Sequence, residues 1–174
     1  MPRRRRTPAA CPAADVGARA SDDSAGEAAG AAATCLVAAV VIGRNEGPRL
    51  LACLDSLPAE IGLILYVDSG STDGSPAAAR ARGAAVVPLD TDRPFTAARA
   101  RNAGLAAVPE AAPYVQFIDG DCTLHPGWVA VAAAFLDANP NVAGVAGRLR
   151  ERAVHASLYN RLCDREWEAP VGET

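Results

Sequence analysis

The chain has 174 residues, which is enough for one domain with a sizeable core, and 50% of them are hydrophobic, many being alanine. A formal net charge of -3 gives no overall indication of nucleic-acid binding, and no apolar run is long enough to span a membrane. The five cysteines are scattered without a Cys-x-x-Cys pair. This argues against a zinc site or a disulfide framework and is typical of a protein of the reducing cytoplasm.

Residues 1–34 are expected to form a disordered tail. They contain the basic run Arg3–Arg6, followed by small and polar residues with almost no large apolar side chain. Such a segment cannot bury enough surface to offset the entropy lost on ordering. The basic run leaves a peripheral contact with a membrane open, but the acidic residues of the tail argue against a targeting signal.

Ordered structure is expected from residue 35 onward. The apolar run 35–42 predicts a strand buried on both faces, as in a parallel sheet. A loop with Asn45 and Glu46 follows, and Pro48 suits the first turn of a helix. This unit places a helix N-terminus at the carboxyl end of a strand, where α/β folds bind anions. The loop matches neither a phosphate loop of the Gly-Lys-Ser type nor the G-x-G-x-x-G fingerprint.

A second strand, residues 63–67, ends on Asp68. The carboxylate has two interpretations at this stage: it stabilises the small polar turn that follows, or it accepts hydrogen bonds from a nucleobase or ribose. Ser75 is expected to cap a short helix that ends before Gly83 and is largely exposed.

A short strand over residues 85–89 contains a proline, which predicts an edge position. Thr96 is expected to cap a helix over residues 97–107. Arg99 and Arg101 lie two positions apart on that helix, so they cannot share one face. Either one of them turns toward a phosphate, or both are ordinary surface arginines.

The fourth strand begins at Tyr114 and leads to Asp119-Gly120-Asp121. Side chains two apart on an extended segment point the same way, so the two carboxylates are expected to converge. Hard divalent cations often take one or two carboxylates together with substrate phosphates. Gly120 is expected to leave room for a ligand near the backbone. The alternative is a strand followed by a common Asp-Gly turn.

The remaining chain predicts a helix from Trp128 to about Asn139, a fifth strand over residues 142–149 and a helix over residues 156–168. The alternation of strands and helices predicts an α/β fold with a mostly parallel sheet flanked by helices. In such sheets ligands lie at the carboxyl ends of the strands. Five polar groups are expected at that edge. They are Asn45, Glu46, Asp68, Asp119 and Asp121.

Four segments resemble family 2 glycosyltransferases, which have the Rossmann-like GT-A fold. They are the first strand and its Asn-Glu loop, residues 40–46; the polar loop 67–74; the Arg-Asn-x-Gly helix start within residues 98–104; and the D-x-D motif, residues 119–121. The resemblance covers about residue 36 to the end. Two departures concern base recognition: Ile42 and Gly43 replace a common proline and threonine or alanine, and Ser69 replaces a second aspartate.

The resemblance implies an inverting transferase that moves a sugar from a nucleotide-diphosphate donor to an acceptor of unidentified class. Asp68 would contact the base or ribose, Asp119 the ribose side, Arg101 the nucleotide phosphates, and Asp121 the divalent metal, Mg²⁺ or Mn²⁺. Asn45 and Glu46 would complete the donor site. Residues 35–174 would then be the donor-binding part of an incomplete GT-A domain, with the general base expected beyond Thr174.

Two further hypotheses stay open. A nucleotidyltransferase also places aspartates and a metal on an α/β sheet, but it would carry a glycine-rich basic loop after the first strand, which residues 43–47 match poorly. A non-catalytic module that binds nucleotide sugars would need no base. A cytoplasmic location, with a possible peripheral contact at the inner membrane face, is expected under each hypothesis.

Overall fold

A computed structural model of the chain describes residues 37–168 and residue 172. The predicted tail, residues 1–34, and the first two residues of the predicted first strand lie outside the described residues. The chain divides into two compact units, one up to Ala130 and one from Val131. The first unit carries the sheet.

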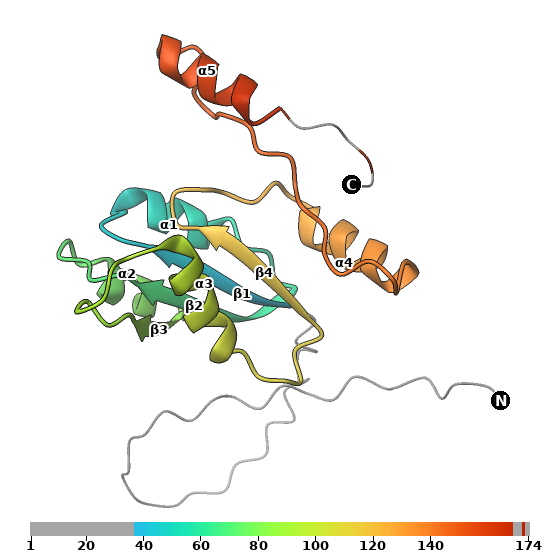
Figure 1. The fold of residues 1–174 in the computed structure, drawn as a ribbon, viewed down its shortest axis with the longest axis horizontal. Helices are drawn as coiled ribbons and strands as arrows, with labels where there is room; N and C mark the ends of the chain where they lie inside the picture. Colours follow the sequence, from blue (N-terminus) through green and yellow to red (C-terminus); the bar gives the residue numbers. More distant parts are fainter. Residues whose placement is uncertain (1–36, 169–171, 173–174) are drawn as a thin grey trace, which may run out of the picture. The chain divides into compact units, whose positions relative to one another are not determined.

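The first unit is built on a four-stranded parallel sheet (Figure 1). The strands are β1 (Val37–Gly43), β2 (Ile61–Asp68), β3 (Ala85–Pro88) and β4 (Tyr114–Asp119), in the order β3-β2-β1-β4. All pairings are parallel. The predicted α/β fold is therefore confirmed, and the proline-containing β3 lies at an edge, as expected.

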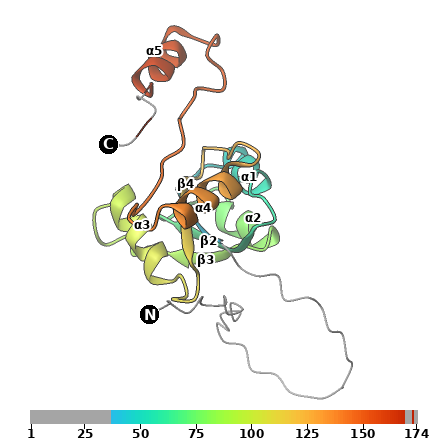
Figure 2. The ribbon, with the colours of Figure 1, turned by 90° about the vertical axis from the view of Figure 1, so that its right-hand side faces the viewer.

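Helices cover both faces of this sheet (Figure 2). The helices α1 (Pro48–Asp55) and α2 (Ser75–Ala81) lie on one face, and α3 (Ala97–Ala106) lies on the other. Alternate side chains of the buried strand β1 serve the two layers. Val41 packs in one cluster with Leu50 of α1, whereas Val40 packs in another with Ala100 of α3. This two-sided burial explains the continuous apolar run of β1.

The helix starts differ in how well they were predicted. Thr96 caps α3 as expected, because its side chain accepts a hydrogen bond from the Arg99 N–H. The expected cap of α2 by Ser75 is wrong, because Gly74 in the left-handed conformation holds the N-cap position. The Asp73 carboxylate accepts the Ser75 N–H at 3.0 Å.

The helix α4 (Trp128–Ala138) begins in the first unit and continues into the second. Its first residues belong to the core of the first unit, where Val129 is buried with Ala39 and Ile61. The Trp128 indole N–H donates to the Gln116 side chain of β4 at 2.8 Å.

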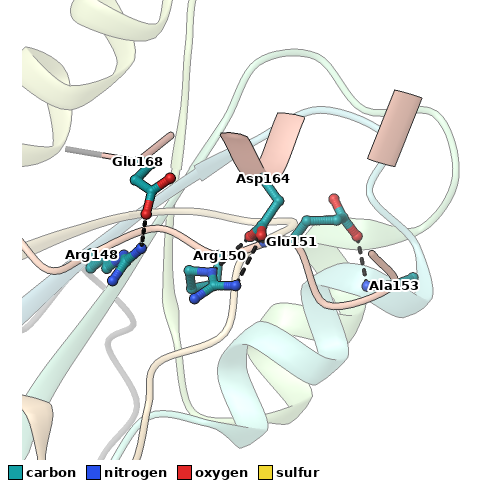
Figure 3. Close-up of polar contacts among 6 residues, drawn as sticks. All are labelled: Arg148, Arg150, Glu151, Ala153, Asp164 and Glu168. Carbon is teal, nitrogen blue, oxygen red and sulfur yellow. Dashed lines mark hydrogen bonds and ion pairs between the residues drawn. The ribbon is translucent and has the colours of Figure 1, made fainter. Parts of the chain in front are cut away.

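The second unit contains the helix α5 (Leu158–Glu166), capped by Ser157. The predicted fifth strand is wrong: residues 142–150 form no regular structure. This segment is rich in alanine and glycine, and it has no partner strand in the described chain. Ion pairs attach this segment to α5 and to the residues just after it, with Arg150 bound to Asp164 of α5 at 2.7 Å and Arg148 to Glu168 at 2.9 Å (Figure 3).

No helix among residues 37–168 is both long and apolar enough to cross a membrane.

Candidate functional site

The carboxyl ends of β1, β2 and β4 meet at one edge of the sheet. Gly43 is the register partner of Asp68, and Ile42 is the partner of Asp119. Loops leave this edge in parallel sheets, so it is where ligands bind. The structure thus brings the predicted polar residues to the carboxyl ends of neighbouring parallel strands, as expected from the α/β fold.

Three carboxylates lie near two thiols at this edge. The pKa of the Cys53 thiol is raised to about 12, first by burial and then by Cys122 and the carboxylates of Asp121, Asp119 and Glu46. The pKa of Cys122 is raised to about 11, again first by burial and then by the same three carboxylates. Two of these carboxylates, Asp119 and Glu46, are themselves paired with arginines.

The D-x-D segment is not extended throughout. The strand β4 ends at Asp119, and the Cys122 N–H donates to the Asp119 carbonyl at 2.9 Å, which closes a turn. The expected geometry, with the two carboxylates two apart on an extended strand, is therefore wrong, because Asp121 lies in a turn after the strand.

Gly120 has a different role from the expected one. A Cβ atom at this position would meet the Ile42 carbonyl oxygen at 3.1 Å and the Glu46 Cγ at 3.4 Å. The space beside Gly120 is thus occupied by the chain itself. The glycine allows β4 to approach the end of β1, and no ligand is needed to explain it.

Arg101 and Asp119 were predicted as separate donor contacts, but they contact each other. The Arg101 guanidinium lies 2.6 Å from the Asp119 carboxylate, with the two side chains 40% and 48% exposed. The pair joins α3 to β4. At this exposure water screens the attraction, so the pair orients the two groups more than it stabilises the fold.

Asp68 is buried and satisfied within the chain. One carboxylate oxygen accepts the N–H groups of Gly70 and Ser71 at 3.1 and 3.0 Å, and the other accepts the Tyr66 hydroxyl at 3.3 Å. These bonds correspond to the turn-stabilising interpretation. Each carboxylate oxygen can accept more than one bond, so contact with a base or ribose stays a prediction.

Asn45 and Glu46 shape the loop after β1. Asn45 has a positive φ of 57°, and its side-chain oxygen accepts the Thr72 N–H at 2.7 Å, which joins this loop to the one after β2. The Glu46 carboxylate pairs with Arg49 at 2.7 Å and is 16% exposed. Their assignment to donor binding also stays a prediction.

The predicted divalent cation would depend on Asp121 and on a bound phosphate. Among the described residues no group of three or more His, Cys, Asp or Glu could hold a metal by itself. Mg²⁺, however, is commonly held by one or two carboxylates together with substrate phosphates. Asp121 is exposed and its carboxylate is the type of ligand that such a cation takes, whereas Asp119 and Glu46 are paired with arginines. The assignment of a divalent metal to Asp121 stays a prediction.

A pocket that was not predicted from the sequence lies beside the end of β2. It is a half-open hollow of about 410 Å³, and most of the residues that line it are exposed. Most of its wall is the stretch 89–95 between β3 and α3. Three residues from other elements complete it: Arg44, Ser69 and Arg99. The sequence of this stretch predicted only a polar loop, because a local sequence does not show that Arg44, Ser69 and Arg99 lie beside it.

The comparison with protein families decides the family. The family model described as glycosyl transferase family 2 matches residues 38–165. The chain belongs to this family. The resemblance inferred from its motifs is thereby confirmed.

This family 2 chain is similar to solved structures of glucosyl-3-phosphoglycerate synthase from Mycobacterium tuberculosis. The structure with phosphoglyceric acid is 27% identical, has a TM-score of 0.51, and the match covers 63% of this chain and 42% of that one. The structure with Mn²⁺, UDP and glucosyl-3-phosphoglycerate is 27% identical, with a TM-score of 0.49 and coverage of 64% and 41%. The chain thus spans about two fifths of the length of these relatives. The comparison with curated proteins gives no match.

Proposed function

We propose that this chain forms the donor-binding part of a glycosyltransferase that takes a sugar from a nucleoside diphosphate. The observation that carries the proposal is that Asp68 and the Asp119–Asp121 turn follow the carboxyl ends of parallel strands in a chain that matches the family 2 model. A diphosphate at this edge would be repelled by the Asp121 carboxylate, and a divalent cation between the two would offset that repulsion.

Each part of the donor has a place in this proposal. The nucleoside lies toward the pocket beside β2 and β3, near Asp68 and Ser69. The diphosphate lies at the β4 end, near Asp121. Asp121 would hold the divalent cation, Mn²⁺ or Mg²⁺, which supplies positive charge to the departing diphosphate. Asp119, whose orientation is held by its pair with Arg101, would face the ribose side of the donor.

The proposed reaction inverts the anomeric carbon. The acceptor hydroxyl oxygen forms a bond to this carbon while the bond from the carbon to the diphosphate oxygen breaks, and the hydroxyl proton passes to a base. We assign this base to no described residue. Because the solved relative makes glucosyl-3-phosphoglycerate and binds phosphoglyceric acid, a small phosphorylated acceptor is a suitable first candidate.

Calorimetry with UDP and GDP, each with Mn²⁺ or Mg²⁺, tests the donor site. We expect binding that depends on the cation, and a loss of at least tenfold in affinity for Asp121→Asn, since a metal ligand is removed. Asp55→Asn is the matched control, because Asp55 ends α1 and pairs with Arg82. A well-folded protein that binds neither nucleotide with either cation would refute the proposal.

Product analysis separates the proposed transfer from its alternatives. Release of a nucleoside diphosphate from a nucleotide sugar supports a glycosyltransferase. Release of pyrophosphate from a nucleoside triphosphate and a sugar phosphate would instead show a nucleotidyltransferase. Binding of the donor without turnover on any acceptor would favour a non-catalytic module.

A further inference from the structure

One side chain makes three hydrogen bonds to the loop between β3 and α3. The Arg99 guanidinium, on the first turn of α3, donates to the carbonyl of Asp90 at 2.7 Å, of Arg93 at 3.1 Å and of Pro94 at 3.5 Å. The three carbonyls span the whole loop. The Arg99 side chain is 24% exposed, so these bonds are shielded in part from water.

Apart from Arg99, the loop is fixed mainly at its start, where the Leu89 N–H donates to the Asp68 carbonyl at 2.8 Å and the Leu89 side chain packs against a core cluster. Residues 89–95 contain no helix or strand, and residues 91–95 are exposed. One local bond joins the Asp92 N–H to the Asp90 side chain at 2.8 Å. The Asp90 carboxylate itself is 3.9 Å from Arg99, at the limit of an ion pair. The backbone carbonyls are therefore the main targets of the guanidinium.

The same loop forms most of the pocket wall. Seven of the residues that line the cavity come from the stretch 89–95, and Arg99 lines it as well. Gly70 opposes this wall, since a Cβ atom there would lie 2.8 Å from Thr91 Cγ2. A loop that moved away from Arg99 would open the cavity on that side.

We propose that Arg99 is a positioning residue that keeps the 89–95 loop shaped to receive the nucleoside part of the donor. This inference rests on the proposed function. It differs from the sequence-based alternatives for Arg99, a phosphate contact or an ordinary surface arginine, because the side chain is committed to backbone carbonyls. The planar guanidinium offers five N–H donors in a fixed fork, whereas a lysine ammonium is a compact point charge that cannot span the three carbonyls.

The variant Arg99→Lys tests this role, because it keeps the charge and removes the fork. Calorimetry with Mn²⁺ compares three probes: UDP, GDP and inorganic pyrophosphate. We expect about a tenfold weaker Kd for both nucleotides if the loop is correctly shaped only a tenth of the time, since apparent affinity falls with the competent fraction. Pyrophosphate, which lacks a nucleoside, is expected to bind the variant and the wild type equally. Arg80→Lys, on α2 and outside the pocket lining, controls for the exchange itself.

The outcomes separate this inference from the proposed function. If wild-type protein binds no nucleotide, both fall together. If wild-type protein binds nucleotides and Arg99→Lys binds them as tightly, only the role of Arg99 is refuted. Equal weakening of nucleotide and pyrophosphate binding also refutes it, because the residue would then act through charge or general folding. Arg99→Met, which keeps an apolar stem without donors, is expected to reproduce the nucleotide defect should the lysine variant fold poorly.

Discussion

At the scale of single residues, Tyr66 and Asp68 form a buried unit at the end of β2. The Tyr66 side chain is fully buried, and its hydroxyl donates to the Asp68 carboxylate. The pKa of Tyr66 is raised to about 12, mainly by burial, against a smaller lowering by Ser71, and in addition by the charge of Asp68. A tyrosinate here would lie without water beside a carboxylate, so the folded protein retains the phenolic proton.

This pKa predicts a loss of stability at high pH. An unfolded tyrosine ionises near pH 10, whereas folded Tyr66 keeps its proton to about 12. The stabilisation is therefore complete below pH 10 and is lost as the pH rises toward 12. We expect the free energy of unfolding in urea to fall less between pH 9 and pH 11.5 for Tyr66→Phe than for the wild type. An equal fall of the free energy of unfolding in the two proteins would contradict this prediction. The raised pKa values of the Cys53 and Cys122 thiols are common to both proteins, so their effects cancel in the comparison.

The sequence predicted the place of the site residues better than their partners. Asp68 and Asp119 were placed at one edge because each ends a buried parallel strand, a rule that needs no side-chain detail. The contact between Arg101 and Asp119 depends on how α3 lies against β4, which local sequence does not encode. For Asp68 the sequence allowed two roles, and it could not show that the carboxylate accepts hydrogen bonds from the turn that follows.

At the scale of elements, the contact of α3 with the sheet depends on Gly104. This glycine is buried and faces β1 and β2. An added Cβ would overlap the Val40 Cγ1 atom and lie 2.9 Å from the Val67 Cγ2 atom. Neither valine side chain has room to move in a packed core, so α3 must shift outward.

We therefore expect Gly104→Ala to destabilise the protein by about 1–3 kcal/mol, the usual range for overpacking, despite the better helix propensity of alanine. Chemical denaturation measures this change. Gly144→Ala is the control, because a Cβ there would meet nothing within 4 Å. Since α3 carries Arg99 and Arg101, the variant is also expected to weaken nucleotide binding. Unchanged stability would show that α3 packs less closely than described.

Element prediction succeeded where burial and turn chemistry agreed. The edge strand β3 and the Thr96 cap of α3 followed from a proline and from a threonine before an alanine-rich helix. The strand predicted over residues 142–149 is absent, because valines spaced by alanine and glycine resemble a strand whether or not a partner strand is available. Pairing is a tertiary property, and the described chain supplies no partner there.

At the scale of the whole molecule, the two units differ in what holds them together. The three core clusters all lie in the first unit, as do the candidate site residues. In the second unit α5 has no buried residue. It is held by ion pairs, such as that between Arg150 and Asp164. Exposed ion pairs contribute little to stability, whereas buried apolar surface contributes most of it.

Native-state hydrogen exchange is expected to show this difference directly. The amides of β1 lie in the centre of the sheet, so they open only with global unfolding and should exchange most slowly. The amides of α5 should exchange through local opening, orders of magnitude faster. Asp164→Asn removes the charge that accepts bonds from Arg150 and from the Glu151 N–H, so it should speed exchange in α5 further. The same variant should leave β1 exchange unchanged, because no core cluster contains a residue of the second unit. Equal slowing or speeding of both elements would mean that the two units unfold as one.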